Sequence, residues 1–138
     1  MTEYRKPIPT PDRVTEEFWD AARRHELLIQ RCRDCGASQF LPQSCCRACL
    51  SQRIQWVAAS GKGKIYSYTI VHRPPTPKFQ EDVPYAVALV ELDEGVRMMS
   101  NIVGIGPQDV RVGMAVEVVF EGISPTISLP KFRPSEAS

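Results

Sequence analysis

The stretch Arg31–Cys49, RCRDCGASQFLPQSCCRAC, contains all five cysteines of this 138-residue chain. Cys32 and Cys35 form one CxxC pair, and Cys46 and Cys49 form a second pair. Each CxxC turn lets two sulfurs point the same way, so a chain that doubles back as a ribbon can bring four thiolates to one point, as tetrahedral Zn(II) requires. The spacing therefore predicts a zinc site. Four cysteine ligands leave no open position, so the metal would be structural.

The alternatives to zinc are iron, redox-active thiols and a site that has lost its metal. Cys45, the fifth cysteine, would turn the second pair into CxxxC if it replaced Cys46, so Cys46 is the better ligand. A catalytic Cys45 would need a base, and His25 and His72 are the two histidines of the chain. We interpret Cys45 as a neighbour of the site without chemistry of its own.

Composition and charge are those of an ordinary globular domain. Hydrophobic residues make up 43% of the chain and charged residues 24%, and the formal net charge is +1. No global field therefore attracts nucleic acid or lipid headgroups. The sequence shows neither a signal peptide nor a run of about 18 apolar residues. We expect a soluble cytoplasmic protein, in which thiols stay reduced.

A helix is expected before the ribbon, over TPDRVTEEFWDAARRHEL, with Thr10 as its N-cap and Pro11 in its first turn. Phe18 and Trp19 are adjacent, so about 100° of helix separates them and one narrow stripe does not hold both. Either one aromatic side chain forms part of a docking surface, or both pack on the ribbon.

Beyond the ribbon, β-forming residues dominate and the pattern changes to period two. Strands are predicted at 64–72, 84–92, 96–104 and 114–122, with a fifth short strand near Trp56 and Val57. Five short antiparallel strands without a crossover helix favour a mainly β fold that ends in a five-stranded OB-fold barrel. His72–Asp82 is predicted to be a proline-rich loop, and Ser124–Ser138 an extended strap that ends in disorder.

These elements divide the chain into four expected parts: a helical docking segment over 1–26, a zinc ribbon over 27–55, a barrel over 56–129 and a tail over 130–138. The sequence contains no GxSxG, HExxH or Walker motif. It supports a scaffold or binding module better than a self-sufficient enzyme.

The order of these motifs resembles a known family. The segments RCRDCG, WVAASGKGKIYSYTIV, PYAVALVELDEGVRMMSNIVG, GMAVEVVFE and LPKFRP are similar to the acyl-CoA-associated family catalogued as domain of unknown function 35, over about Pro9–Pro134. The resemblance implies an N-terminal helix, a rubredoxin-like zinc ribbon and an OB-fold. It also implies a small partner subunit of thiolase-superfamily enzymes, such as acetoacetyl-CoA thiolase with hydroxymethylglutaryl-CoA synthase, the phloroglucinol acyltransferase complex, or the lipid-transfer-type aldolases of steroid side-chain degradation.

Carried onto this sequence, the resemblance places the metal ligands at Cys32, Cys35, Cys46 and Cys49. Cys45 and Leu50 are departures from the family pattern, and many members have glycine at the position of Leu50. In several members the barrel is thought to help bind CoA or to close the partner's active site. The candidates for binding the CoA phosphates and adenine are the basic and aromatic groups Lys62, Lys64, Tyr66, Tyr68, Lys131, Phe132 and Arg133, although each is also consistent with ordinary strand surface.

Two other classes of function stay open. Zinc ribbons and OB barrels both occur in proteins that bind single-stranded nucleic acid, and salt-dependent binding to an oligonucleotide would indicate that class. A small redox protein with iron in the four-cysteine site, as in rubredoxin, would be red.

Overall fold

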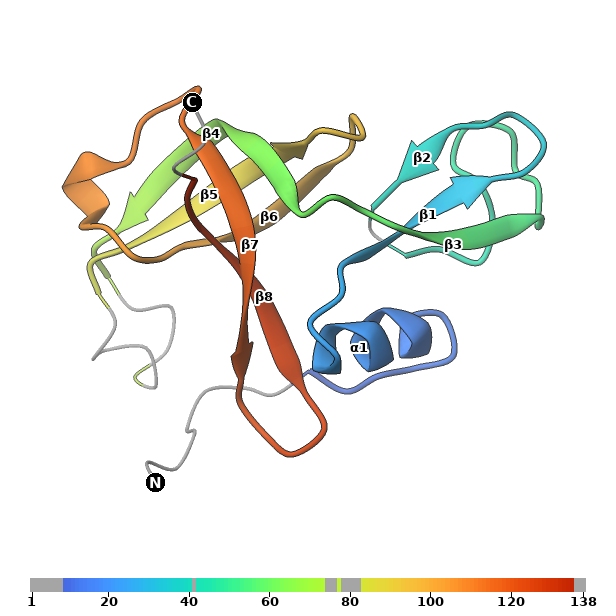
Figure 1. Ribbon diagram of the computed structural model, residues 1–138, viewed down its shortest axis with the longest axis horizontal. Helices are drawn as coiled ribbons and strands as arrows, with labels where there is room; N and C mark the ends of the chain where they lie inside the picture. Colours follow the sequence, from blue (N-terminus) through green and yellow to red (C-terminus); the bar gives the residue numbers. More distant parts are fainter. Residues whose placement is uncertain (1–8, 41, 74–76, 78–82, 136–138) are drawn as a thin grey trace.

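The computed structural model describes residues 9–40, 42–73, 77 and 83–135, and most of the expected proline-rich loop lies outside these ranges. One helix, a three-stranded sheet and a closed barrel follow one another along the chain (Figure 1). The bounds are α1 (Glu16–Arg23), β1 (Leu28–Cys32), β2 (Ser38–Gln39), β3 (Ile54–Ala58), β4 (Lys62–Val71), β5 (Tyr85–Leu92), β6 (Arg97–Ile102), β7 (Ala115–Gly122) and β8 (Ser128–Pro134), with a 3-10 turn η2 (Pro107–Asp109) before β7. Within the described ranges, no helix is long and apolar enough to span a membrane.

Helix α1 is shorter than expected and begins at Glu16, not after Thr10. The Asp12 carboxylate accepts the backbone N–H groups of Val14 at 3.0 Å and Thr15 at 2.9 Å, which forms a turn ahead of the helix. The expectation of Thr10 as N-cap was therefore wrong, and Thr15 occupies that position.

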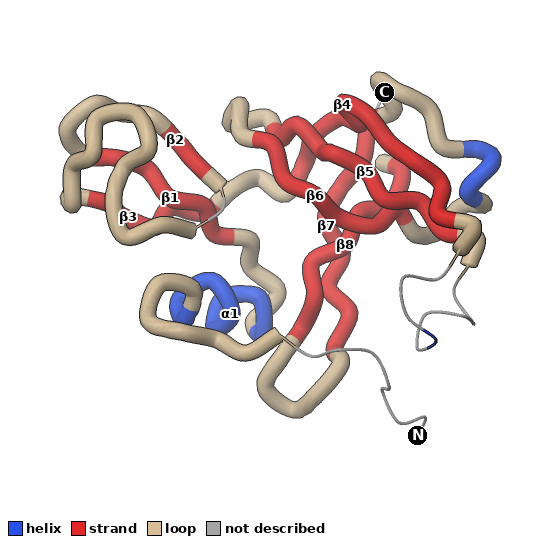
Figure 2. Tube along the Cα trace, turned by 180° about the vertical axis from the view of Figure 1, so that it is seen from behind, coloured by secondary structure: helices blue, strands red, loops and turns tan. Residues whose placement is uncertain are grey.

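Both helix aromatics face the protein interior. Phe18 is 5% exposed, and the half-buried Trp19 meets it edge-on with ring centroids 5.0 Å apart. The ring centroid of Phe40 lies 5.4 Å from that of Phe18, and His25 stacks on Phe120 of β7. The helix therefore lies between the ribbon and the barrel (Figures 1 and 2), and both aromatics pack against the core. The docking role of residues 1–26 stays a prediction.

The three-stranded sheet has the order β2-β1-β3 and carries the cysteine-rich segment. β3 pairs antiparallel with β1, and Trp56 lies opposite Gln30. The strand expected near Trp56 therefore belongs to the ribbon, and its assignment to the barrel was wrong.

The barrel closes in the order β4-β5-β6-β8-β7, which is the five-stranded OB arrangement. Its fifth strand is β8, which lies in the segment expected to be a strap. β8 pairs with β7 from Gly122↔Ser128 to Val116↔Pro134, and Phe132 lies opposite Ile102 of β6. Inward-facing side chains such as Ile65, Val90 and Phe132 form the core. The fold class is confirmed. The domain bounds stay a prediction, although the strand assignments of β3 and β8 differ from it.

The linker between the ribbon and the barrel, residues 59–61, forms hydrogen bonds with two different parts of the barrel. The Ser60 N–H donates to Glu94 Oε2 at 2.7 Å, and the Val118 N–H donates to the Gly61 carbonyl at 2.7 Å. Gly61 has φ +78°, and a Cβ there would lie 2.6 Å from Val118 Cγ1. The linker backbone therefore comes so close to β7 that this position requires glycine. The close contact fixes the ribbon against the barrel.

Candidate metal centre and barrel face

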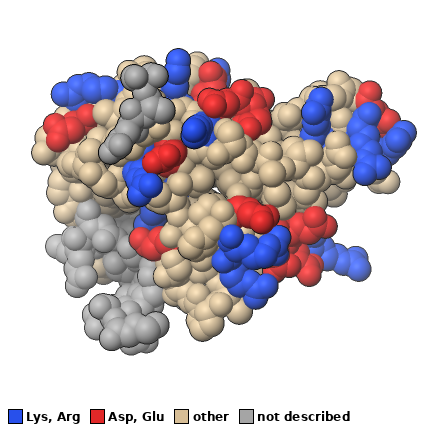
Figure 3. All heavy atoms as spheres, in the orientation of Figure 1, with Lys and Arg blue, Asp and Glu red and all other residues tan. Residues whose placement is uncertain are grey.

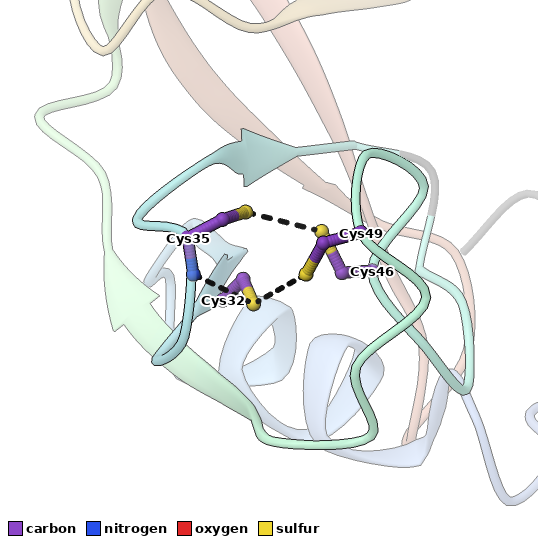
Figure 4. Close-up of side chains that lie close together, drawn as sticks. All are labelled: Cys32, Cys35, Cys46 and Cys49. Atoms are coloured by element: carbon purple, nitrogen blue, oxygen red, sulfur yellow. Dashed lines mark hydrogen bonds between the residues drawn. The ribbon is translucent and has the colours of Figure 1, made fainter.

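The four predicted ligands converge between two loops of the ribbon (Figure 4). Cys32 ends β1, Cys35 follows in the next turn, and Cys46 and Cys49 lie in the loop between β2 and β3. Their sulfurs all lie within 4.8 Å of one another, and Cys32–Cys49 and Cys35–Cys46 are each 3.6 Å apart. A tetrahedral zinc with Zn–S bonds of about 2.3 Å requires sulfur separations of about 3.8 Å. The donor set therefore fits a four-thiolate metal, which would cross-link the two loops.

The two CxxC turns have the same internal hydrogen bonds. The Gly36 N–H donates to the Cys32 carbonyl at 3.0 Å, and the Leu50 N–H donates to the Cys46 carbonyl at 2.9 Å. Gly36 and Leu50 both have positive φ, of 77° and 65°. Leu50 is 74% exposed, so no burial of its side chain offsets the strain of the left-handed backbone.

The four thiols are electrostatically unequal. Backbone N–H groups of Cys35 and Asp34 point at the Cys32 sulfur and lower the pKa of that thiol to about 6. The backbone N–H of Cys49, followed by that of Ala48, lowers the pKa of Cys46 in the same way. Backbone N–H groups lower the pKa values of the exposed Cys35 and Cys49, but the contacts with the Cys46 and Cys32 sulfurs and burial outweigh them, so both pKa values are raised. The two buried thiols therefore lose their protons more readily than the two exposed ones.

Cys45 lies outside the four-sulfur cluster and is half-buried. Its carbonyl accepts a hydrogen bond from Gln39 Nε2 at 3.2 Å. This placement agrees with its interpretation as a neighbour of the site.

The predicted CoA-binding cations lie on β4 and β8, which β7 separates. Glu117 of β7 is opposite both Lys62 and Arg133, and the Arg133 Nε lies 3.1 Å from its carboxylate. Lys131 is paired with Glu121 in the same way, at 3.1 Å. Lys131 and Arg133 are thus neutralised by glutamates of β7. Figure 3 shows basic and acidic groups interspersed over the visible face of the barrel.

The prediction for Phe132 was wrong. Its side chain is 0% exposed inside the barrel, so it is unable to stack on a bound adenine. Lys62 and Lys64 are exposed and take part in none of the ion pairs found among the described residues.

Tyr66 and Tyr68 are 49% and 37% exposed. Tyr66 is the extra residue of a β-bulge, because Ile65 and Ser67 pair with the consecutive residues Val90 and Leu89 of β5. Tyr66 lies on the outer surface beside the buried Ile65, as strand alternation predicts, and the alternation is lost after the bulge, where Ser67 and Tyr68 are also exposed.

Three side chains that the sequence analysis did not single out lie on β5 and β6, and one of them contacts Tyr66. The Arg97 guanidinium lies 3.7 Å above its ring, and Arg97 Nε is 3.0 Å from Glu91. Leu89 and Met99 face each other across β5 and β6, and Met99 is 70% exposed. We call Tyr66, Leu89, Arg97 and Met99 the outer barrel patch; its strands β5 and β6 face the viewer in Figure 2. The alternation in RMMSNI, with Met98 buried and Met99 exposed, is the signal that could have identified it.

Two family models match consecutive parts of the chain. One is described as the rubredoxin-like zinc ribbon domain of ChsH2 and matches residues 19–55. The other is described as the C-terminal OB-fold domain of ChsH2 and matches residues 56–121. Together with the geometry above, they define a protein of the zinc-ribbon and OB-fold class.

Relatives and a solved structure agree with this class. A DUF35 domain-containing scaffold protein of Methanocaldococcus jannaschii is 37% identical over 81% of this chain and 80% of its own length. A probable enoyl-CoA hydratase alpha subunit of Thermomonospora curvata is 41% identical over 94% of this chain, which spans only 40% of that relative's length. A solved chain described as "Ltp2-ChsH2(DUF35) aldolase" superposes with a TM-score of 0.82 at 41% identity, over 92% of this chain and 98% of its own. The chain belongs to the DUF35 family, and the resemblance found in the sequence is confirmed.

Proposed function

We propose that this chain is a non-catalytic subunit of a thiolase-like acyltransferase or aldolase complex that acts on acyl-CoA or ketide substrates. The observation that carries the proposal is the similarity, over 92% of this chain, to the DUF35 chain of an aldolase structure. The partner, a thiolase-superfamily protein, would supply the catalytic groups. The chain would scaffold the complex in the cytoplasm.

Zinc is the metal that we propose for the four-cysteine site. The sulfur separations of 3.6 Å suit a tetrahedral ion, and four thiolates leave no position for a substrate. The metal would stabilise the ribbon by cross-linking its loops, and Cys32, Cys35, Cys46 and Cys49 would hold it.

The outer barrel patch is the surface that we propose for the enzyme partner. Tyrosine, arginine and methionine are enriched at protein interfaces, and here a tyrosine is already ordered under an arginine. Because Glu91 pairs with Arg97, the patch has little net charge and suits a protein better than a phosphate backbone.

A contribution to CoA binding is proposed for Lys62 and Lys64 at the edge of this patch. Both are exposed cations, and Tyr66 follows them on β4 with about half of its surface free. Phosphates bind lysine, and an adenine ring stacks on a flat partner such as tyrosine.

The test is an affinity purification of the tagged chain from its native extract, followed by mass spectrometry and metal analysis. We expect a thiolase-superfamily protein and about one zinc per chain. Met99→Lys should abolish recovery of this partner, whereas Val112→Lys, which changes a residue 65% exposed on the loop before β7, should leave it unchanged. Recovery of a hydratase, with no thiolase-superfamily protein, would show that the partner belongs to a different class of enzyme. Salt-dependent binding to a single-stranded oligonucleotide, with no enzyme recovered, would favour the nucleic-acid alternative.

A further inference from the structure

Two buried glutamines lie beside the four-cysteine site. Gln30 of β1 and Gln39 of β2 are opposite each other in the sheet and are 3% and 7% exposed. A buried amide without partners costs free energy, so such side chains persist where every polar group is satisfied. The hydrogen-bond partners of these two side-chain amides show which part of the backbone the glutamines hold in place.

Gln30 binds both backbone groups of one residue in the loop that follows β2. Its Oε1 accepts the Gln43 N–H at 2.8 Å, and its Nε2 donates to the Gln43 carbonyl at 2.9 Å. These backbone partners fix the orientation of the amide, because an N–H requires an oxygen and a carbonyl requires a donor.

Gln39 extends this contact toward the cysteines. Its Nε2 donates to Gln30 Oε1 at 2.8 Å and to the Cys45 carbonyl at 3.2 Å, and its Oε1 accepts the Arg47 N–H at 2.9 Å. We call Gln30 and Gln39 the glutamine clasp. It binds the backbone on both sides of Cys46, which is the first ligand of the second CxxC turn.

The loop that carries this turn pairs with no strand within the described range 42–50. Its own backbone bonds are local: the Cys46 N–H donates to Ser51 at 2.8 Å, and the Leu50 N–H donates to Cys46 at 2.9 Å. On the far side, the Ser51 hydroxyl donates to Asp34. The clasp thus fixes the entry to the turn against the sheet, through side chains that take no part in the metal site.

We propose that Gln30 and Gln39 are positioning residues that hold the second CxxC turn opposite the first one without the metal. The four-thiolate site is then assembled before metal arrives, and binding does not have to order the loop. Preorganisation of this kind raises affinity because the ordering entropy is already lost in the free protein. The part of the inference that concerns affinity rests on the metal site proposed above.

The first experiment needs no variant. Amide hydrogen exchange is measured by NMR on the full chain after chelator treatment. We expect the Gln43 and Arg47 amides to exchange at least tenfold more slowly than in an unstructured peptide. Exchange at peptide rates, with protection appearing only when zinc is added, would overturn the proposal.

The second experiment compares zinc affinity by competition with a chromophoric chelator. Gln39→Met keeps the length of the side chain and removes its three hydrogen bonds, so zinc should bind about tenfold to a hundredfold more weakly. Gln55→Met is the matched control: it changes a half-buried glutamine of β3 that accepts a bond from Arg33, and it should stay within about twofold of wild type. Equal affinities in Gln39→Met and wild type would contradict the clasp.

Gln39→Glu covers the case in which Gln39→Met unfolds the ribbon. The carboxylate keeps the acceptor for Arg47 and loses the two donated bonds, while its charge alone would favour a cation. If this variant binds zinc more weakly than wild type at pH 8, the cause is the loss of the two hydrogen bonds that Gln39 donates. Tighter binding than wild type would refute the inference. If the wild-type chain takes up no zinc, the metal proposal fails, and protection of Gln43 and Arg47 still decides whether the clasp exists.

Discussion

Phe132→Ala should destabilise the barrel strongly, because β8 is one of its five strands. Phe132 is 0% exposed and lies opposite Ile102 of β6 and Val118 of β7. The lost transfer of the ring from water is worth about 2 kcal/mol. If most of the roughly 100 Å³ removed stays as a cavity, about 24 cal/mol per Å³ adds about 2 kcal/mol more. The expected loss is therefore about 4 kcal/mol in the free energy of unfolding.

The assay is urea unfolding followed by far-UV circular dichroism, with wild-type and variant slopes compared. Arg133→Ala is the control on the same strand: its side chain is 56% exposed, so loss of its ion pair with Glu117 should cost about 1 kcal/mol or less. A loss below about 1 kcal/mol for Phe132→Ala would show that residues 128–134 behave as a dispensable strap, and the reasoning would be refuted.

Three further outcomes follow from the four-cysteine site. Zinc affinity should fall steeply below about pH 6, because protons then compete for the Cys32 thiolate, whose pKa is lowered to about 6. At neutral pH the Cys49 thiol, with a pKa raised to about 12, should release its proton on binding; calorimetry in buffers of different ionisation enthalpy measures this, and zero proton release would contradict the assignment. Leu50→Gly should stabilise the metal-free ribbon by about 0.5 kcal/mol, because glycine adopts the φ of 65° without strain, whereas Leu50→Ala should have no such effect. A loss of thermal stability in Leu50→Gly would show instead that the leucine side chain holds the turn.

The cysteine site could be predicted because its information is local. Two CxxC pairs within one short segment restrict where the sulfurs can point, and the structure brings these four together and leaves Cys45 outside. Which four cysteines cluster can thus be predicted from spacing alone. The glutamine clasp is not, because Gln30 and Gln39 become neighbours only through the pairing of β1 with β2.

The charged side chains on the outer face of the barrel, in contrast, could not be interpreted from local sequence. Lys131 and Arg133 look like phosphate ligands in the sequence, yet Glu121 and Glu117 of a neighbouring strand neutralise them. Strand register decides such pairs, and a one-residue shift would move each glutamate to the other face. The bulge at Tyr66 likewise depends on the pairing of β4 with β5.

The sequence by itself determined which four cysteines come together, the β-rich character and the family, because turn chemistry, period-two patterning and motif order are properties of short segments. Tertiary structure alone decided that β3 belongs to the ribbon, that β8 closes the barrel, and that Phe132 belongs to the core. A short apolar strand is compatible with several partners, and the choice depends on which surfaces remain unburied after the other strands have paired. That choice is a property of the whole chain.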